Sequence, residues 1–166
     1  MKGRLRIAEP SDVSELHAIR TAAADALTDL HGTGFWSTVT SERTMKGYTA
    51  KGTLYAYEYD GQLLGTLGLV DKPGFVRKGW FRDPDASAGY VIHMAVSPEH
   101  QEQGHGRRCM ECVERLARDR GREALRLDSL RGPAGAGEFY RKCGYEQVHE
   151  GSFNDVPLVY WEKVLA

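Results

Sequence analysis

The stretch that decides the fold of this chain is IHMAVSPEHQEQGHGRRCMECVERLA, residues 92–117. It begins inside the apolar segment from Tyr90 to Val96, which predicts a buried strand. Ser97 and Pro98 end that strand, because proline has no amide hydrogen to donate to a neighbouring strand. From Gly104 to Arg120 apolar residues recur at helical spacing, which predicts an amphipathic helix. The stretch therefore predicts a strand, a glycine-containing turn and a helix in direct succession.

The turn between this strand and this helix has the features of an anion-binding site. The first four amides of a helix have no partner within it, and the aligned peptide dipoles add about half a positive charge there. Gly104 and Gly106 let a bulky anion approach the backbone, and Arg107 and Arg108 add positive charge. The P-loop motif is absent from the sequence, and Cys109 occupies the third glycine position of the dinucleotide-binding motif. Two glycines at this spacing also occur in plain turns, so the turn alone leaves both interpretations open.

Hydrophobic periodicity predicts further elements on both sides of this stretch. Two β-rich segments, Thr53–Tyr59 and Leu63–Val70, are joined by Asp60-Gly61, which is typical of a tight hairpin turn. The remaining expected elements are a strand over Leu5–Ala8, a helix beginning near Val13, a helix over Ser41–Tyr48, a strand over Ala124–Leu130, a short helix over Ala134–Lys142 and strands over Tyr145–His149 and Leu158–Val164. This order of elements predicts the α/β (α+β) class, with a mixed sheet and helices on both faces.

Composition narrows the class of protein. A chain of 166 residues, 41% hydrophobic and 27% charged, predicts a soluble globular protein of one domain over residues 1–166. Its net charge of −1 argues against a nucleic-acid binder that relies on bulk charge. The longest apolar-rich segment, Gly61 to Val70, is shorter than the roughly 20 residues of a membrane span. No apolar run follows the first charged residues, as a secretion signal would require. We therefore expect a cytoplasmic protein with no nucleic-acid and no membrane partner.

The cysteines favour free thiols over a metal site. The odd count of Cys109, Cys112 and Cys143, without a secretion signal, argues for reduced side chains. Cys109 and Cys112 form a C-x-x-C pattern, which also occurs in zinc sites and redox pairs. No second pair has the spacing that would complete a zinc site, and this pair lies inside a helical pattern. We expect two small buried residues one helical turn apart, and no metal.

Residues 92–117 resemble the acetyl-CoA-binding motif of the GNAT superfamily of N-acyltransferases. That motif is a strand and a short loop, followed by Q/R-x-x-G-x-G/A at the start of a helix, and its positions are filled here by Gln101, Gly104 and Gly106. The segment EFYRKCGYEQV resembles the second landmark of the family, through Tyr140, Gly144 and Tyr145. The order of elements and the separation of the landmarks match over nearly the whole chain. The resemblance implies the GNAT fold, with a mostly antiparallel sheet of about six to seven strands.

The resemblance also implies an acetyl-CoA-dependent N-acetyltransferase that transfers the acetyl group directly to an amine, with both substrates bound together. Backbone amides of the glycine turn would bind the pyrophosphate, and the edge of the strand before it would pair with the pantetheine arm. The amide of Met94 or Ala95 would stabilise the oxyanion, and Tyr140 would act as general acid to the coenzyme A thiolate. The implied cofactor-binding residues are Met94, Ala95, Val96, Gln101, Gln103, Gly104, His105, Gly106, Arg107, Ser129 and Tyr140.

The chain departs from the family pattern at two positions. Tyr90 stands where some members carry a basic glutamate, and Pro133 stands where many carry a cofactor-contacting asparagine. His93 is then a candidate base, since an unperturbed histidine has a pKa of about 6.5, although a histidine in a buried strand is as often a hydrogen-bonded structural residue. Glu58 and Asp71, which flank the hairpin, could act as bases through water. Ser129, Arg131 or backbone amides could take over the contact of the missing asparagine, or the contact is weaker. These departures keep a second interpretation open, a non-catalytic module that binds coenzyme A.

The acceptor is not identified by any motif. We expect it to be a small-molecule amine that contacts Phe35, Trp36, Trp80, Phe81 and Tyr90, which are aromatic residues of the first helical region, the long loop and the central strand. Aminoglycosides, polyamines, amino acids and protein N-termini all stay open as acceptors. A homodimer, which is common in the family, stays open as well.

Overall fold

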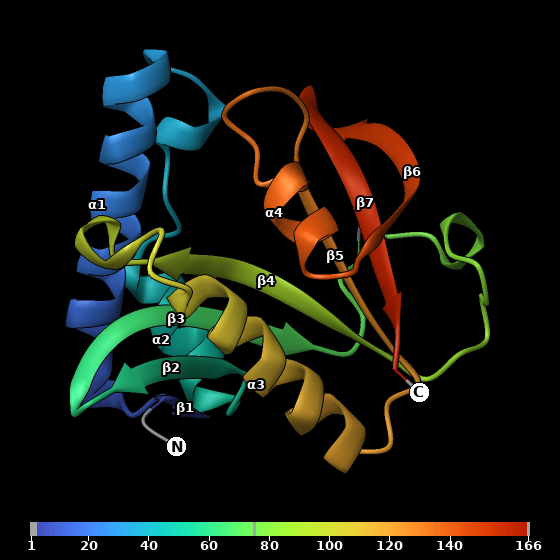
Figure 1. The fold of residues 1–166 in the computed structure, drawn as a ribbon, viewed down its shortest axis with the longest axis horizontal. Helices are drawn as coiled ribbons and strands as arrows, with labels where there is room; N and C mark the ends of the chain where they lie inside the picture. The colour runs from blue at the N-terminus through green and yellow to red at the C-terminus, as the bar shows by residue number, and fades with distance from the viewer. Residues whose placement is uncertain (1–2, 75, 166) are drawn as a thin grey trace. The chain divides into compact units, whose positions relative to one another are not determined.

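The computed structural model describes residues 3–74 and 76–165 of the chain (Figure 1). Its helices and strands follow the predicted order and are β1 Gly3–Ile7, α1 Val13–His31, α2 Glu42–Ala50, β2 Leu54–Tyr59, β3 Gln62–Val70, β4 Ala88–Val96, α3 His105–Asp119, β5 Ala124–Leu130, α4 Gly137–Lys142, β6 Glu146–Phe153 and β7 Val156–Val164. Short 3-10 helices lie in the connections, at η1 Pro10–Asp12, η2 Phe35–Ser37, η3 Lys78–Trp80 and η4 Pro98–His100.

The strands form a seven-stranded sheet in the hydrogen-bonded order β1-β2-β3-β4-β5-β7-β6. Strands β4 and β5 pair in parallel, whereas β1–β2, β2–β3, β5–β7 and β6–β7 are antiparallel. This arrangement confirms the predicted α/β class with a mixed, mostly antiparallel sheet. The contacts of the chain fall into two compact units, unit 1 (Met1–Leu69 with His93–Val113) and unit 2 (Val70–Ile92 with Glu114–Ala166). One domain over residues 1–166 stays a prediction.

In unit 1 helices cover both faces of the strands. On one face α1 and α2 pack on β2 through a buried cluster of Ala8, Val13, Leu16, Ile19, Met45, Leu54 and Ala56. Because side chains alternate along a strand, Tyr55 and Tyr57 of β2 point to the opposite face. There the Tyr57 hydroxyl lies 3.4 Å from Nδ1 of His105, the first residue of α3. Figure 1 accordingly shows α3 in front of β2 and β3 and α2 behind them.

In unit 2 the strands are covered by α4 on one face and by the long loop between β3 and β4 on the other. On the α4 face, the indole nitrogen of Trp161 donates a hydrogen bond of 2.9 Å to Ser129. On the loop face, the ring of Trp80 stacks on His149 with a centroid distance of 4.4 Å. The loop is therefore packed against the sheet, and its aromatic residues contribute to the core of this unit.

The hairpin prediction is confirmed, and the largest boundary differences lie at the start of α4 and at the end of β6. Asp60 and Gly61 have φ angles of 50° and 82°, as a type I′ turn requires. Helix α4 begins at Gly137 rather than Ala134, because a side chain at Gly135 would collide with the Leu130 carbonyl, so this segment is a tight turn. Strand β6 extends to Phe153 because it pairs with β7, which outweighs the weak strand propensity of its polar and glycine residues.

The C-x-x-C pair lies as predicted. Cys109 and Cys112 are both buried on α3, and the described part of the chain contains no disulfide. Burial raises the pKa of the Cys109 thiol well above its usual range, so this thiol stays protonated and unreactive at neutral pH. In the described residues, no helix is both long enough and apolar enough to span a bilayer.

Candidate functional site

The centre of the candidate site is the second half of β4, which begins with an unusual backbone conformation. His93 has a φ angle of 53°, and a non-glycine residue in this region within a strand marks a bulge or local strain. The register of β4 with β5 covers Ala88 to Val91. After the bulge the chain runs with β3, where the Ser97 amide donates to the Leu64 carbonyl at 2.8 Å. The segment His93–Val96 therefore forms the edge of the sheet in unit 1.

The loop after β4 is held in shape by its own polar side chains. The side-chain amide of Gln101 donates to the Val96 carbonyl at 3.0 Å, and that of Gln103 donates to the Glu99 carbonyl at 3.2 Å. Glu102 and Gly104 both lie in the left-handed region, with φ angles of 62° and 83°. In this structure the Gln101 side chain thus braces the end of β4, and the loop turns sharply just before α3.

The first turn of α3 has one buried side chain, His105, and two charged side chains at its surface, Arg107 and Arg108. The imidazole of His105 is buried, with its ring centroid 4.6 Å from that of Tyr59 in an edge-on contact. Arg108 donates to the Gln103 carbonyl at 3.2 Å, and Arg107 is exposed beside Glu111. A helix start with fixed backbone, open amides and two nearby arginines is suited to an anion. The sequence-predicted residues Met94 to Val96 and Gln101 to Arg107 thus lie together in unit 1.

His93 is held among the helices of unit 1. Its Nδ1 lies 3.2 Å from the hydroxyl of Thr40, and its ring packs at 5.4 Å from that of Tyr48. Burial, together with the positive charge of Arg20, lowers the pKa of His93 to about 4. The imidazole is therefore neutral at pH 7, where it forms hydrogen bonds readily but accepts a proton only weakly.

This lowered pKa predicts a loss of stability in acid. Unfolded histidine protonates near pH 6.5 and folded His93 near pH 4, so protons bind the unfolded chain first as the pH falls. The stability is fully present above pH 6.5 and is lost as the pH falls towards 4. Between pH 7 and pH 4.5, His93→Asn should lose about 2 to 3 kcal/mol less free energy of unfolding than the wild type.

Denaturant titration of both proteins at the two pH values measures this difference. Asparagine suits the control position because it tolerates a positive φ angle. Any carboxylates that titrate in the same range contribute equally to both proteins and cancel in the comparison. An equal acid-induced loss in the two proteins would contradict the assigned pKa of His93.

Tyr140 and Ser129 belong to unit 2. Tyr140 lies on α4 and is buried, with its ring edge-on to Phe139 at 5.1 Å and to Tyr145 at 6.0 Å. Ser129 is also buried and accepts the hydrogen bond of Trp161 described above. Its hydroxyl is thus used in the packing beneath α4, and both residues are held rigidly in place.

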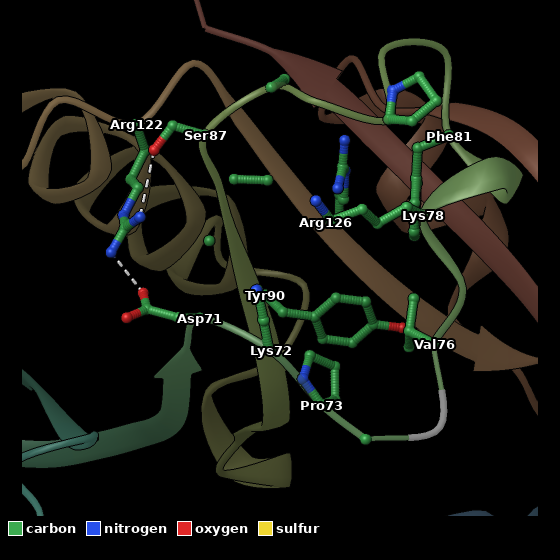
Figure 2. A pocket seen from close by; sticks show the side chains of 15 residues that line it. Asp71, Lys72, Pro73, Val76, Lys78, Phe81, Ser87, Tyr90, Arg122 and Arg126 are labelled. Carbon is green, nitrogen blue, oxygen red and sulfur yellow. Dashed lines mark hydrogen bonds and ion pairs between the residues drawn. The ribbon is translucent and has the colours of Figure 1, made fainter.

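Unit 2 also contains a pocket of about 390 Å³ between the long loop and the starts of β4 and β5 (Figure 2). Figure 2 shows Tyr90 and Arg126 extending into the space bounded by the segment that carries Val76 and Phe81. The Tyr90 hydroxyl donates to Asp128 at 2.6 Å, and burial raises the pKa of both groups. The Phe81 ring lies 4.1 Å beneath the guanidinium of Arg126.

The five aromatic residues expected to contact the acceptor are thus distributed over separate places. Phe81 and Tyr90 both line the pocket of unit 2. Trp80 is not among the residues that line this pocket, and its ring stacks on that of His149. In unit 1, Phe35 is exposed, while the Trp36 indole donates to the Gly32 carbonyl at 2.8 Å. Contact of all five with one acceptor stays a prediction.

Sequence reasoning missed Asp128, Arg126 and Arg20. The first two are charged residues at alternate positions of the otherwise apolar strand β5, and Arg126 pairs with Glu162 at 2.8 Å. Arg20 follows the core residues Leu16 and Ile19 at helical spacing on α1. Each of them is a charged residue at a position where the apolar pattern predicts a side chain that faces the core. This conflict was the signal that could have identified them.

Known proteins resemble this chain in sequence and in fold. The family model described as the Acetyltransferase (GNAT) family matches residues 16–145. The uncharacterized N-acetyltransferase YesJ of Bacillus subtilis (strain 168) is 25% identical over 139 residues, which cover 81% of this chain and 77% of that protein. A GNAT-family acetyltransferase structure from Listeria monocytogenes 4b F2365 aligns with a TM-score of 0.77 at 18% identity, covering 98% of this chain and 95% of that one. A yncA structure from Salmonella typhimurium, solved with its cofactor acetyl-CoA, aligns with a TM-score of 0.69 at 17% identity, covering 100% and 95%.

Proposed function

Because the chain belongs to the acetyltransferase (GNAT) family, we propose that it transfers the acetyl group of acetyl-CoA to the amine of a small molecule. The observation that carries the proposal is the family match over residues 16–145, a range that includes β4, the glycine turn and Tyr140. The name of the Bacillus subtilis relative, an N-acetyltransferase, supports the same reaction class. The acetyl-CoA bound to the Salmonella typhimurium protein supports the choice of donor.

The residues of unit 1 fit a coenzyme A molecule. Gly104, at a φ angle of 83°, brings the backbone close to the start of the 15-residue helix α3, where amides without helical partners favour a pyrophosphate. The exposed Arg107 adds positive charge beside them. The edge of β4 presents main-chain groups that match the amides of a pantetheine arm. We assign the pyrophosphate to the amides of Gln103 to Arg107 and the arm to Met94 to Val96.

Three groups of this chain would then perform the transfer. Acetyl-CoA, when bound, supplies the acetyl group as an activated thioester. The amide of Met94 or Ala95 donates a hydrogen bond to the acyl oxygen as negative charge develops there. The amine nitrogen forms the C–N bond as the C–S bond breaks, and it releases a proton to water. Tyr140 donates its phenolic proton to the departing thiolate and regains a proton from water. His93, neutral at pH 7, accepts a hydrogen bond from the acceptor amine and orients it, and its low pKa makes it a weak proton acceptor. Donor and acceptor are bound together, and the transfer is direct.

A thiol-release assay with acetyl-CoA and a panel of amines tests the proposal. We expect thiol release with at least one amine among amino acids, polyamines, aminoglycosides and peptide N-termini. Isothermal titration with acetyl-CoA runs in parallel and separates binding from turnover. Binding without release for every amine would support the non-catalytic coenzyme A module instead. Absence of both binding and release would overturn the enzyme and the binding module together.

A further inference from the structure

Arg20 on α1 is a cationic side chain whose donors are left open. Its Nε and Nη1 atoms are buried, and neither has a hydrogen-bond partner among the residues that the structure describes. The hydroxyl of the next residue, Thr21, is likewise buried and unpartnered within the described part of the chain. Burial lowers the pKa of Arg20 to about 10, so the guanidinium keeps its charge at pH 7. A polar cluster with a full positive charge and unused donors is therefore built into unit 1.

Other arginines in this protein show what Arg20 lacks. Arg126 is buried and pairs with Glu162 at 2.8 Å. Arg6 is partly buried and contacts Asp12 at 2.7 Å and Glu58 at 2.8 Å. Burying a charge without a partner is unfavourable, so a fold usually supplies a carboxylate, as it does in these two cases. The absence of such a group at Arg20 among the described residues points to a carboxylate that is supplied from outside the chain.

The position of Arg20 connects it to the candidate site. Helix α1, which carries Arg20, packs against η4, the segment that joins β4 to the glycine turn. The charge of Arg20 adds to burial in lowering the pKa of His93. His93 directly precedes Met94, whose amide is one of the groups assigned above to the acyl oxygen. Thr40 and Tyr48 contact His93 and belong to the same unit. Arg20 thus belongs to a helix that packs beside the segment between β4 and the glycine turn.

We propose that Arg20 binds an anionic group of the acceptor, and that the acceptor is a small amine carrying a carboxylate, as an α-amino acid does. This proposal rests on the proposed acetyl transfer. A guanidinium matches a carboxylate through paired hydrogen bonds, and a buried one gains more from such a partner than an exposed one. The same charge repels acceptors that carry only positive groups, such as polyamines. A phosphonate offers the same oxygen chemistry, so aminoalkylphosphonates form a separate arm of the test.

The test compares the wild type with Arg20→Met, which keeps most of the side-chain volume and removes the charge. Each of the common α-amino acids is paired with its decarboxylated amine in the thiol-release assay, and aminoalkylphosphonates are assayed beside them. Arg20→Met should raise the KM for a carboxylate-bearing acceptor roughly 10- to 100-fold. The Kd for acetyl-CoA should stay unchanged. Because the substitution removes an unpaired buried charge, the melting temperature should stay equal or rise. Arg43→Met, which removes an exposed charge from α2, should behave as the wild type.

The outcomes separate this proposal from the proposed function. An unchanged KM in Arg20→Met, or a wild type that uses decarboxylated amines as well as amino acids, would overturn the role of Arg20 while leaving acetyl transfer intact. A preference for phosphonates over carboxylates would keep Arg20 as the anion site and correct the acceptor. If no amine supports thiol release, titration calorimetry with the same amino acids decides. Binding to the wild type and not to Arg20→Met would support the anion site without the reaction, and no binding to either would overturn it.

Discussion

Replacing Tyr140 by phenylalanine is expected to lower kcat about 100- to 10,000-fold while leaving the Kd for acetyl-CoA nearly unchanged. The substitution removes the proposed proton donor to the thiolate and keeps the aromatic ring. That ring is buried on α4 between Phe139 and Tyr145, so its packing is retained. The loss should therefore fall on the chemical step, because the coenzyme A contacts assigned to unit 1 are untouched.

Steady-state kinetics with the best acceptor, together with acetyl-CoA titrations, measure this separation of kcat from affinity. Tyr145→Phe is a matched control, since it removes a hydroxyl from a neighbouring buried tyrosine that lies 3.4 Å from Glu114. It should alter stability and leave kcat close to that of the wild type. A kcat in Tyr140→Phe equal to that of the control would remove Tyr140 from the mechanism.

Replacing Gly104 by valine is expected to weaken acetyl-CoA binding about 100-fold or more. At a φ angle of 83° a residue with a Cβ atom is strained by roughly 1 to 2 kcal/mol, and a β-branched residue more so. A Cβ at this position meets only the Arg108 side chain, at 3.6 Å, so the chain itself leaves room for it. The larger effect is expected on the ligand, because the new side chain stands where the pyrophosphate would approach the amides of α3.

Gly121→Val separates the effect on the ligand from the effect on the backbone. Gly121 has a φ angle of 71° just after α3, and no atom lies within 4 Å of a Cβ built there. Both variants should lose similar stability in thermal unfolding, and only Gly104→Val should lose affinity in titration calorimetry. Wild-type affinity in both variants would show that the glycine turn does not hold the pyrophosphate. An equal loss in both would attribute the effect to folding.

Much of the fold could be predicted because its signals are local. The alternation before Asp60-Gly61 and the positive φ angles that this pair tolerates suffice to define the β2–β3 hairpin. The helical spacing of apolar residues after Gly104 predicts α3, including the burial of Cys109 and Cys112. The predicted boundaries of helices and strands were wrong where contacts with a distant segment determine where the element begins or ends. The end of β6 depends on its pairing with β7. The start of α4 depends on the close approach of the Gly135 backbone to the Leu130 carbonyl, which leaves no room for a side chain.

The candidate site divides in the same way. The sequence by itself determined the strand, glycine turn and helix, and the family to which they belong, because period and glycine position are local properties of the chain. Only the tertiary structure decided what the polar side chains do there. Gln101 turns back to the Val96 carbonyl, and His93 takes a positive φ angle among Thr40 and Tyr48. The Nε and Nη1 atoms of Arg20 are buried without a hydrogen-bond partner in the described chain. The protonation state of His93 and the unused hydrogen-bond donors of Arg20 depend on burial and on residues far apart in the sequence. No local sequence pattern encodes these contacts.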